Sequence, residues 1–241
     1  MLNGVPYRFG MFAALVLAVG PAHLQAAPST GADKATARFE AEVSALVARP
    51  LPSGGISTLF LGSSSIRLWD VDGSFPDLDA LNRGFGGATT ADVLYHYQRI
   101  IAGVQPDTVI VYVGENDIAA GASAEAAEAD VLALMTRLRG DMPRARIAYL
   151  SMKPTPLRWD LYAKMAAANA VIKAQASEIG YDFVDVGAAL LDEGGKPDPR
   201  FFSVDGLHLN AQGYRRWTGI LARYLSGSAD EAVRAAASGA R

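Results

Sequence analysis

Short apolar runs alternate with helical patterns five times along this chain, and this alternation limits its fold more than any other feature. The runs lie at residues 58–61, 80–85, 108–113, 146–150 and 182–186. Most are continuously apolar rather than alternating, as expected for parallel strands covered on both faces. Between the runs, apolar residues recur at helical spacing. The pattern predicts an α/β fold, a three-layer α/β/α sandwich around a five-stranded parallel sheet.

The ends of several predicted helices can be read from capping residues. Residues 39–47 have helical spacing and are stopped by prolines at 50 and 52. Thr89 followed by Asp92 predicts a capping-box-like start for the next long helix. The other expected N-caps are Ser123, Asp160 and Asn210.

The first 26 residues have the pattern of a secretory signal peptide. Arg8 precedes a short apolar stretch at residues 11–19, Pro21 breaks that stretch, and Ala26 offers a small residue for cleavage. The stretch is short for a membrane span, and the alternatives are an uncleaved anchor or a buried N-terminal helix. We expect a secreted or periplasmic protein without a stable membrane anchor after cleavage. Its single domain would occupy residues 27–226, followed by a disordered tail at 227–241.

The charge balance argues against several classes of partner. Removing the signal peptide takes one of the 22 basic residues away and leaves 25 acidic ones, so the mature net charge is −4. This balance favours neither nucleic acid nor an anionic membrane as a partner. The chain has no metal-ligand spacing and no phosphate-binding glycine motif, so no metal and no cofactor is expected. The oligomeric state is left open.

Small or polar residues follow four of the apolar runs. These clusters are Gly-Ser-Ser-Ser at 62–65, Gly-Gly-Ala-Thr at 86–89, Gly-Glu-Asn-Asp at 114–117 and Asp-Gly-Leu-His at 205–208. The carboxyl ends of parallel strands share one edge of a sheet, where ligands bind. Ester hydrolysis by a serine needs an imidazole that takes the hydroxyl proton, a carboxylate that orients the imidazole, and N–H donors for the developing oxyanion. The four clusters together contain each of these groups.

Each cluster taken singly also has a structural interpretation. Serines after a strand favour turns and helix caps, and Asp205-Gly206 is a turn signal. His96 lies in a helical pattern, where a packed or surface histidine is the ordinary explanation. His208, three residues after Asp205, is therefore the better candidate for a catalytic imidazole. The structural interpretations do not explain why the four clusters occur together.

In this order, the clusters resemble the sequence blocks of the SGNH, or GDSL-type, hydrolases, a family of esterases and lipases. The resemblance covers residues 58 to about 224. It implies a flavodoxin-like sheet and a serine esterase that forms an acyl-enzyme without a cofactor. By position, it makes Ser64 the nucleophile, His208 the general base and Asp205 the residue that orients the base. Ser63 stands where the family usually has an aspartate, and Ser65 and Ser63 are rival nucleophiles.

The same resemblance assigns an oxyanion hole. Its donors would be the backbone N–H groups of Ser64 and Gly87 and the side-chain amide of Asn116, with Gly86 as the alternative to Gly87. A glycine suits this position because the backbone can approach the substrate without a Cβ in the way.

The remaining candidates are possible neighbours of the substrate. Lys153, Arg158 and Trp159 follow the fourth run in a proline-rich loop on the same edge, and the alternative is a packed Trp beside solvated basic residues. Arg67 and Trp69 have the same two interpretations.

The expected substrate is a small-molecule or glycan ester with a short acyl group such as acetyl, because no long apolar lid segment is evident. Thioesterase or lysophospholipase activity stays open. The rival functions are a flavin-binding module and a non-catalytic carbohydrate-binding relative.

Overall fold

The computed structural model describes residue 1, residues 38–51 and residues 54–238, with side chains described up to residue 227. The predicted signal peptide, residues 1–26, lies outside the described residues except for Met1. The described part from residue 38 onward belongs to one compact unit, Gly31–Arg241, and the account below concerns this unit.

A five-stranded parallel sheet forms the centre of the unit. Its strands are β1 (Thr58–Gly62), β2 (Ala80–Gly84), β3 (Thr108–Tyr112), β4 (Arg146–Leu150) and β5 (Asp182–Val184). They lie in the order β2-β1-β3-β4-β5, and every neighbouring pair is parallel. This is the flavodoxin-like order, so the predicted fold class is confirmed. Three strands end one or two residues before the predicted ends, which is the usual scatter of such boundaries.

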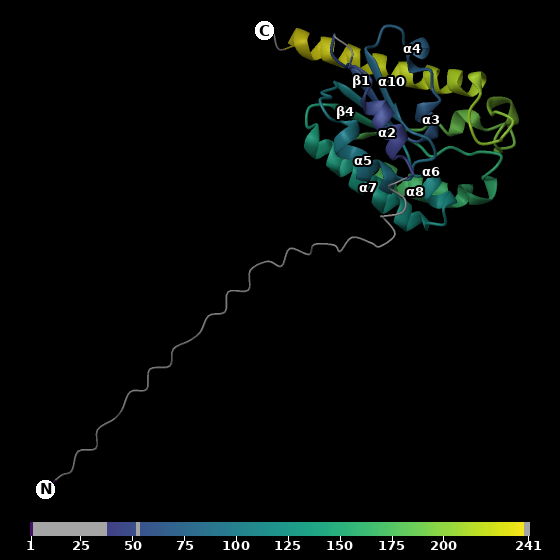
Figure 1. Cartoon of the computed structure of the whole chain (residues 1–241), viewed down its shortest axis with the longest axis horizontal. Coiled ribbons are helices and arrows are strands. Elements are labelled where there is room, and N and C mark those ends of the chain that lie inside the picture. The colour runs from purple at the N-terminus through teal and green to yellow at the C-terminus, as the bar shows by residue number, and fades with distance from the viewer. Residues whose placement is uncertain (2–37, 52–53, 239–241) are drawn as a thin grey trace. The chain divides into compact units, whose positions relative to one another are not determined.

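Helices cover both faces of the sheet (Figure 1). One apolar core packs the sheet against α2 (Glu40–Val47), α5 (Thr90–Ile100), α7 (Ala124–Asp141), α8 (Tyr162–Ala174) and the short α9 (Ala176–Ile179). A second core, on the opposite face, involves α3 (Ser64–Arg67), α4 (Val71–Ser74) and the long α10 (Ala211–Ser238). Successive residues of β1 show the division: Leu59 belongs to the first core and Phe60 to the second.

Three of the four predicted caps are found. Thr89 and Asp92 form a complete capping box at the start of α5. The Ser123 side chain accepts a hydrogen bond from the Ala126 N–H at the start of α7. The Asn210 side chain accepts from the N–H groups of residues 212 and 213, over 2.8 and 3.1 Å, and so caps α10.

Two predictions about the helices are wrong. Asp160 does not cap α8, because it lies inside a 3-10 turn, Trp159–Leu161, and the helix begins after that turn at Tyr162. The chain does not become a loose tail near Ser226, since α10 continues to Ser238. Residues 229–238 include five alanines, and alanine has the highest helix propensity of all residues.

Candidate active site

Ser64 stands where the first strand gives way to helix α3. Strand β1 ends at Gly62, whose φ of +147° suits glycine, and a side chain there would collide with the carbonyl oxygen of Tyr112. This close approach lets the Ser63 N–H donate to the same oxygen over 3.0 Å. The turn therefore presents Ser64 at the first position of α3, at the carboxyl edge of the sheet.

Ser64, His208 and Asp205 form a continuous chain of hydrogen bonds. The Ser64 Oγ lies 3.0 Å from His208 Nε2, and His208 Nδ1 lies 2.6 Å from Asp205 Oδ2. The other Asp205 oxygen accepts the backbone N–H groups of Leu207 and His208 over 2.9 and 3.0 Å. The carboxylate thus holds both the loop and the ring. With Nδ1–H directed at the carboxylate, Nε2 is left to accept a proton from the serine.

The loop around Asp205 favours the ionised carboxylate. Burial alone would raise the pKa of Asp205, but hydrogen bonds from the His208 ring and from the N–H groups of Leu207 and His208 lower this pKa to about 2. The carboxylate is therefore charged across the neutral range and can stabilise a protonated imidazole.

The three adjacent serines differ in what their hydroxyls contact. Ser65 is buried, and its Oγ accepts a hydrogen bond from Lys153 Nζ over 3.1 Å. Ser63 is also buried. Within the described part of the chain, Ser64 is the only serine with its hydroxyl on an imidazole. The geometry thus favours Ser64 over its two neighbours as the nucleophile.

The two candidate glycines also differ in their N–H groups. The Gly86 N–H donates to Glu42 Oε1 over 3.0 Å, whereas the Gly87 N–H has no acceptor among the described residues. A Cβ added to Gly87 would meet nothing within 4 Å, so lack of room is not what requires glycine. Its φ of +66° is the reason, because this region disfavours residues with a side chain.

Asn116 lies in the short helix α6 (Glu115–Ala119), which follows β3. Its Nδ2 donates to the Ala88 carbonyl over 3.0 Å, and its Oδ1 accepts from Arg158 Nη1 over 3.0 Å. An amide nitrogen carries two hydrogens, so one remains for a ligand.

A buried group of charges lies behind this amide. Lys153 Nζ is 2.6 Å from Glu115 Oε2, and Arg158 Nη1 is 2.9 Å from Glu115 Oε1. The Tyr112 hydroxyl also donates to Glu115. Burial alone would raise the pKa of Glu115, but the two cations and their hydrogen bonds lower it below its ordinary value. Glu115 is thus an ionised acceptor shared by Lys153 and Arg158.

The three predicted substrate neighbours take different positions. Lys153 is only 1% exposed, and its ammonium group is hydrogen-bonded to Ser65 and Glu115 beneath residues 62–65, which we call the serine turn. It does not line an open pocket. Arg158 reaches the site beside Asn116. Trp159 is partly exposed and stacks on Tyr162 with a centroid distance of 5.3 Å.

Two spaces adjoin the hydrogen-bonded chain. A gap of about 10 Å³ lies between the serines and the side chains of Asn116, Arg158 and Leu207, and it has room for about one water-sized atom. A wider groove of about 630 Å³ is lined by His208. Its further lining includes Leu68, Ser74, Ser203, Tyr214 and Arg215.

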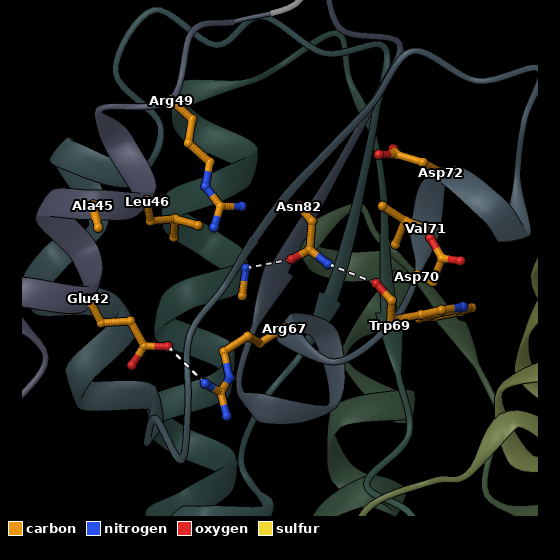
Figure 2. Close-up of a pocket in the computed structure, with 11 residues that line it drawn as sticks. Glu42, Ala45, Leu46, Arg49, Arg67, Trp69, Asp70, Val71, Asp72 and Asn82 are labelled. Carbon is orange, nitrogen blue, oxygen red and sulfur yellow. Dashed lines mark hydrogen bonds and ion pairs between the residues drawn. The ribbon is translucent and has the colours of Figure 1, made fainter.

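A third pocket, of about 440 Å³, lies over the edge strand β2 and contains Arg67 and Trp69 (Figure 2). Figure 2 shows Arg67 facing Glu42, and the two form an ion pair of 3.5 Å. Trp69 is buried, stacks on Tyr214 and donates its indole N–H to Ser74 over 3.0 Å. The structure thus gives Trp69 a packing role, while Arg67 stays at the surface. His96 is also buried, with its ring edge-on to Phe85.

The flavodoxin-like sheet and the side chains at its carboxyl edge indicate an α/β enzyme that hydrolyses esters. The sequence profile of the GDSL-like Lipase/Acylhydrolase family matches residues 67–216, more than half of the chain. The protein belongs to this family and is a hydrolase of ester bonds. The match includes Asn116, Asp205 and His208 and begins just after Ser64.

Solved structures from several bacteria share the fold. A protein from Streptococcus pneumonia, provisionally named a platelet activating factor, is 23% identical, with a TM-score of 0.70 over 81% of this chain and 94% of its own. A GDSL-like lipase from Bacteroides thetaiotaomicron is 18% identical, with a TM-score of 0.68 over 80% and 99%. An Axe2 mutant from Geobacillus Stearmophilus, an acetyl-xylooligosaccharide esterase, is 19% identical, with a TM-score of 0.58 over 70% and 93%. A search of curated proteins gave no match.

Neither a metal-binding cluster nor a membrane-spanning helix occurs among the described residues. No group of three or more His, Asp or Glu side chains there could hold a metal ion. No helix in that part of the chain is long and apolar enough to cross a membrane.

Sequence reasoning missed Tyr112 and Glu115 as parts of the site. Glu115 lies inside the Gly-Glu-Asn-Asp cluster and is 3% exposed. A buried carboxylate needs a cation, and a lysine with a second basic residue in the loop after β4 could have indicated the pairing. Tyr112 ends an apolar strand, and nothing in the sequence around it indicates that its hydroxyl contacts Glu115.

Proposed function

We propose that the protein is a secreted serine esterase that hydrolyses carboxylic esters through an acyl-enzyme on Ser64. The observation that carries the proposal is the hydrogen-bonded chain from Ser64 through His208 to Asp205. His208 Nε2 takes the proton of Ser64 as the hydroxyl oxygen attacks the ester carbonyl carbon. The protonated ring then gives that proton to the departing alcohol, and the acyl group stays on the serine.

Water completes the cycle by the same proton transfers. His208 removes a proton from a water molecule, whose oxygen attacks the acyl carbon. The tetrahedral intermediate collapses, and the proton returns to Ser64 as the carboxylic acid leaves. Asp205 keeps its charge throughout and stabilises the protonated ring, which is consistent with its lowered pKa of about 2.

The negative oxygen of each intermediate would lie against three donors: the N–H groups of Ser64 and Gly87 and the free hydrogen of the Asn116 amide. Each such donor contributes about 3 to 4 kcal/mol to transition-state stabilisation. The gap of about 10 Å³ beside Ser64 and Asn116 has room for a single oxygen atom and excludes an acyl chain.

A short acyl group, with acetyl as the first choice, is part of the proposal because the sequence has no evident long apolar lid segment. The groove of about 630 Å³ beside His208 is wide and partly polar, so it suits a larger alcohol part such as a small molecule or a glycan. A neighbour in fold is an acetyl-xylooligosaccharide esterase, which agrees with this choice. Thioesters and lysophospholipids are the alternative substrates within the family.

Export is part of the proposal and rests on the signal-peptide pattern of residues 1–26. Expression of the full chain in a bacterial host, followed by N-terminal sequencing of the exported protein, is expected to show Ala27 as the first residue. An intact Met1 on the exported protein would contradict cleavage.

The activity is tested with Ser64→Ala and the matched control Ser65→Ala. Ser64→Ala is expected to fold normally and to lose turnover of p-nitrophenyl acetate, whereas Ser65→Ala keeps most of it. A panel of p-nitrophenyl esters from acetate to decanoate tests the acyl preference, and kcat/KM is expected to fall as the chain lengthens. Undiminished turnover by Ser64→Ala would refute the assignment of the nucleophile.

A further inference from the structure

Arg158 joins the oxyanion side of the site to the buried charges behind it. Its Nη1 donates to Asn116 Oδ1 over 3.0 Å and to Glu115 Oε1 over 2.9 Å. A guanidinium nitrogen of this kind carries two hydrogens, so one atom serves both acceptors. Glu115 and Asn116 are neighbours in α6, and Arg158 comes from a loop more than 40 residues later.

These contacts fix which way the Asn116 amide points. Arg158 holds its oxygen, and the Ala88 carbonyl accepts one of its hydrogens over 3.0 Å. A flipped amide would set its N–H groups against the guanidinium and its oxygen against the Ala88 carbonyl. Both contacts would be repulsive, so only the observed orientation satisfies both neighbours.

Arg158 is itself held firmly. Glu115 is fully ion-paired, with Lys153 Nζ 2.6 Å from its other oxygen. The loop before Arg158 is fastened to the loop of Asp205 and His208 by the hydrogen bond from the Leu157 N–H to the Gly206 carbonyl, over 3.0 Å. The guanidinium therefore has little freedom to leave Asn116.

The local charge also favours a negative oxygen. Arg158 Nη1 lies 3.0 Å from Asn116 Oδ1, so a positive charge stands directly against the amide oxygen. Arg158 is 17% exposed, so the solvent screens its charge less than that of a surface arginine. The positive charge of Arg158 thus lies behind the amide that would face the oxyanion.

We propose that Arg158 is a positioning residue that aims and polarises the Asn116 amide toward the oxyanion, and does not bind the substrate in its ground state. The proposal rests on the proposed function. It replaces the direct substrate contact that the sequence suggested for Arg158 with action through Asn116. Such an interaction strengthens as charge develops, so it acts on kcat rather than on KM.

The test is a double-mutant cycle with p-nitrophenyl acetate on wild type, Arg158→Met, Asn116→Ala and the double variant. Arg158→Met is expected to lower kcat by about 10-fold or more while KM changes less than about 3-fold. Asn116→Ala is expected to lower kcat by about 100-fold or more. The double variant should match Asn116→Ala within about 2-fold, because Arg158 has nothing left to position.

Two further variants keep the result interpretable. Arg137→Met removes a surface arginine of the Arg137–Asp141 pair and is expected to leave kcat unchanged. Arg158→Lys keeps the charge and a single donor nitrogen, replaces the Met variant if that variant fails to fold, and should give a kcat between wild type and Asn116→Ala.

Three results would overturn the proposal: wild-type kcat in the Arg158 variants, effects that multiply in the double variant, or a rise in KM at constant kcat. These results are separable from failure of the proposed function. A Ser64→Ala protein that still turns over ester refutes the function itself, whereas an inactive Ser64→Ala protein with an unaffected Arg158→Met protein refutes only the role of Arg158.

Discussion

Asp205 combines a lowered pKa with considerable exposure. Its side chain is 44% exposed, yet three hydrogen bonds hold its pKa at about 2 instead of the ordinary 3.8. Because the folded-state pKa lies below the unfolded one, the ionised carboxylate favours the folded loop above about pH 4. This contribution is lost as the pH falls from about 4 through 2.

Asp205→Asn is expected to lower kcat by about 100-fold to 10,000-fold with little change in KM, because a neutral amide stabilises neither the required tautomer nor the charged ring. Steady-state kinetics at pH 7 measure this. Asp160→Asn, at an exposed aspartate outside the site, is the matched control and should behave as wild type. A decrease of less than 5-fold in Asp205→Asn would show that the carboxylate does not act on His208.

At the residue scale, the sequence predicted which side chains lie at the site but not always which partner each one contacts. Ser63, Ser64 and Ser65 are identical in type, and only the turn after Gly62 decides which hydroxyl meets His208. Lys153 was predicted to border the substrate because nothing in its own loop identifies its partner Glu115, which is 38 residues away and follows a different strand. Local patterns find turn and cap residues, whereas the pairing of buried charges depends on tertiary packing.

At the element scale, helix α5 begins against a buried carboxylate from α6. The Thr90 N–H donates to both oxygens of Asp117, over 3.0 and 3.1 Å. A negative charge at a helix N-terminus is normally stabilising. Here burial raises the pKa of Asp117 to about 6 despite the hydrogen bonds from Thr90, and Asp130 adds to the increase. Burial therefore has the larger effect.

This pKa predicts a pH-dependent stability. Between about pH 4 and 6 the folded protein binds a proton at Asp117 that the unfolded chain does not, so the free energy of unfolding falls as the pH rises through this range. Because the pKa of Asp117 is about 6 in the folded protein and 3.8 ordinarily, the free energy of unfolding falls by about 3 kcal/mol over the whole range. Asp117→Asn is expected to flatten this dependence, since an amide can still accept from Thr90 without ionising.

Urea unfolding at pH 4, 5, 6 and 7 measures the effect. Asp72→Asn, at an exposed aspartate in α4, is the control and should keep the wild-type slope. An unchanged slope in Asp117→Asn would mean that another group titrates in this range.

N-cap residues in the sequence also predicted where most of these helices begin. Thr89, Ser123 and Asn210 act as predicted, because an N-cap bond spans only two or three residues. Asp160 failed because a 3-10 turn intervenes before α8, and capping preferences alone do not detect such a turn.

At the scale of the whole molecule, the alternation of runs and helices predicted a parallel sheet, because parallel neighbours need crossovers, whereas the flavodoxin-like strand order came from the family resemblance. The length of α10 did not follow, because the glycines and serines after residue 225 resemble a tail more than a helix. This helix contacts the turn that carries Ser64: the Tyr214 hydroxyl donates to the Ser65 carbonyl over 2.9 Å. Helix α10 thus links the second core to the serine turn.

Trp217 is the main anchor of α10 on the sheet. It is fully buried, and its ring lies 5.0 Å from that of Tyr112 and 5.6 Å from that of Trp69. Trp217→Ala is expected to lower the free energy of unfolding by about 3 to 5 kcal/mol, through lost burial and the cavity left behind. It should also reduce activity at temperatures where wild type is stable, since Tyr112 contacts the buried charges and Tyr214 the serine turn.

Trp217→Phe is the matched control. The phenyl ring keeps much of the packing, and the indole N–H has no acceptor among the described residues, so losing it removes no hydrogen bond. Its expected cost is at most about 2 kcal/mol, with activity close to wild type. Urea unfolding and p-nitrophenyl acetate turnover at 20 °C give both quantities. Equal stability of the two variants would mean that ring packing at this position does not secure α10, and the link from the second core to the serine turn would then have to lie elsewhere along the helix.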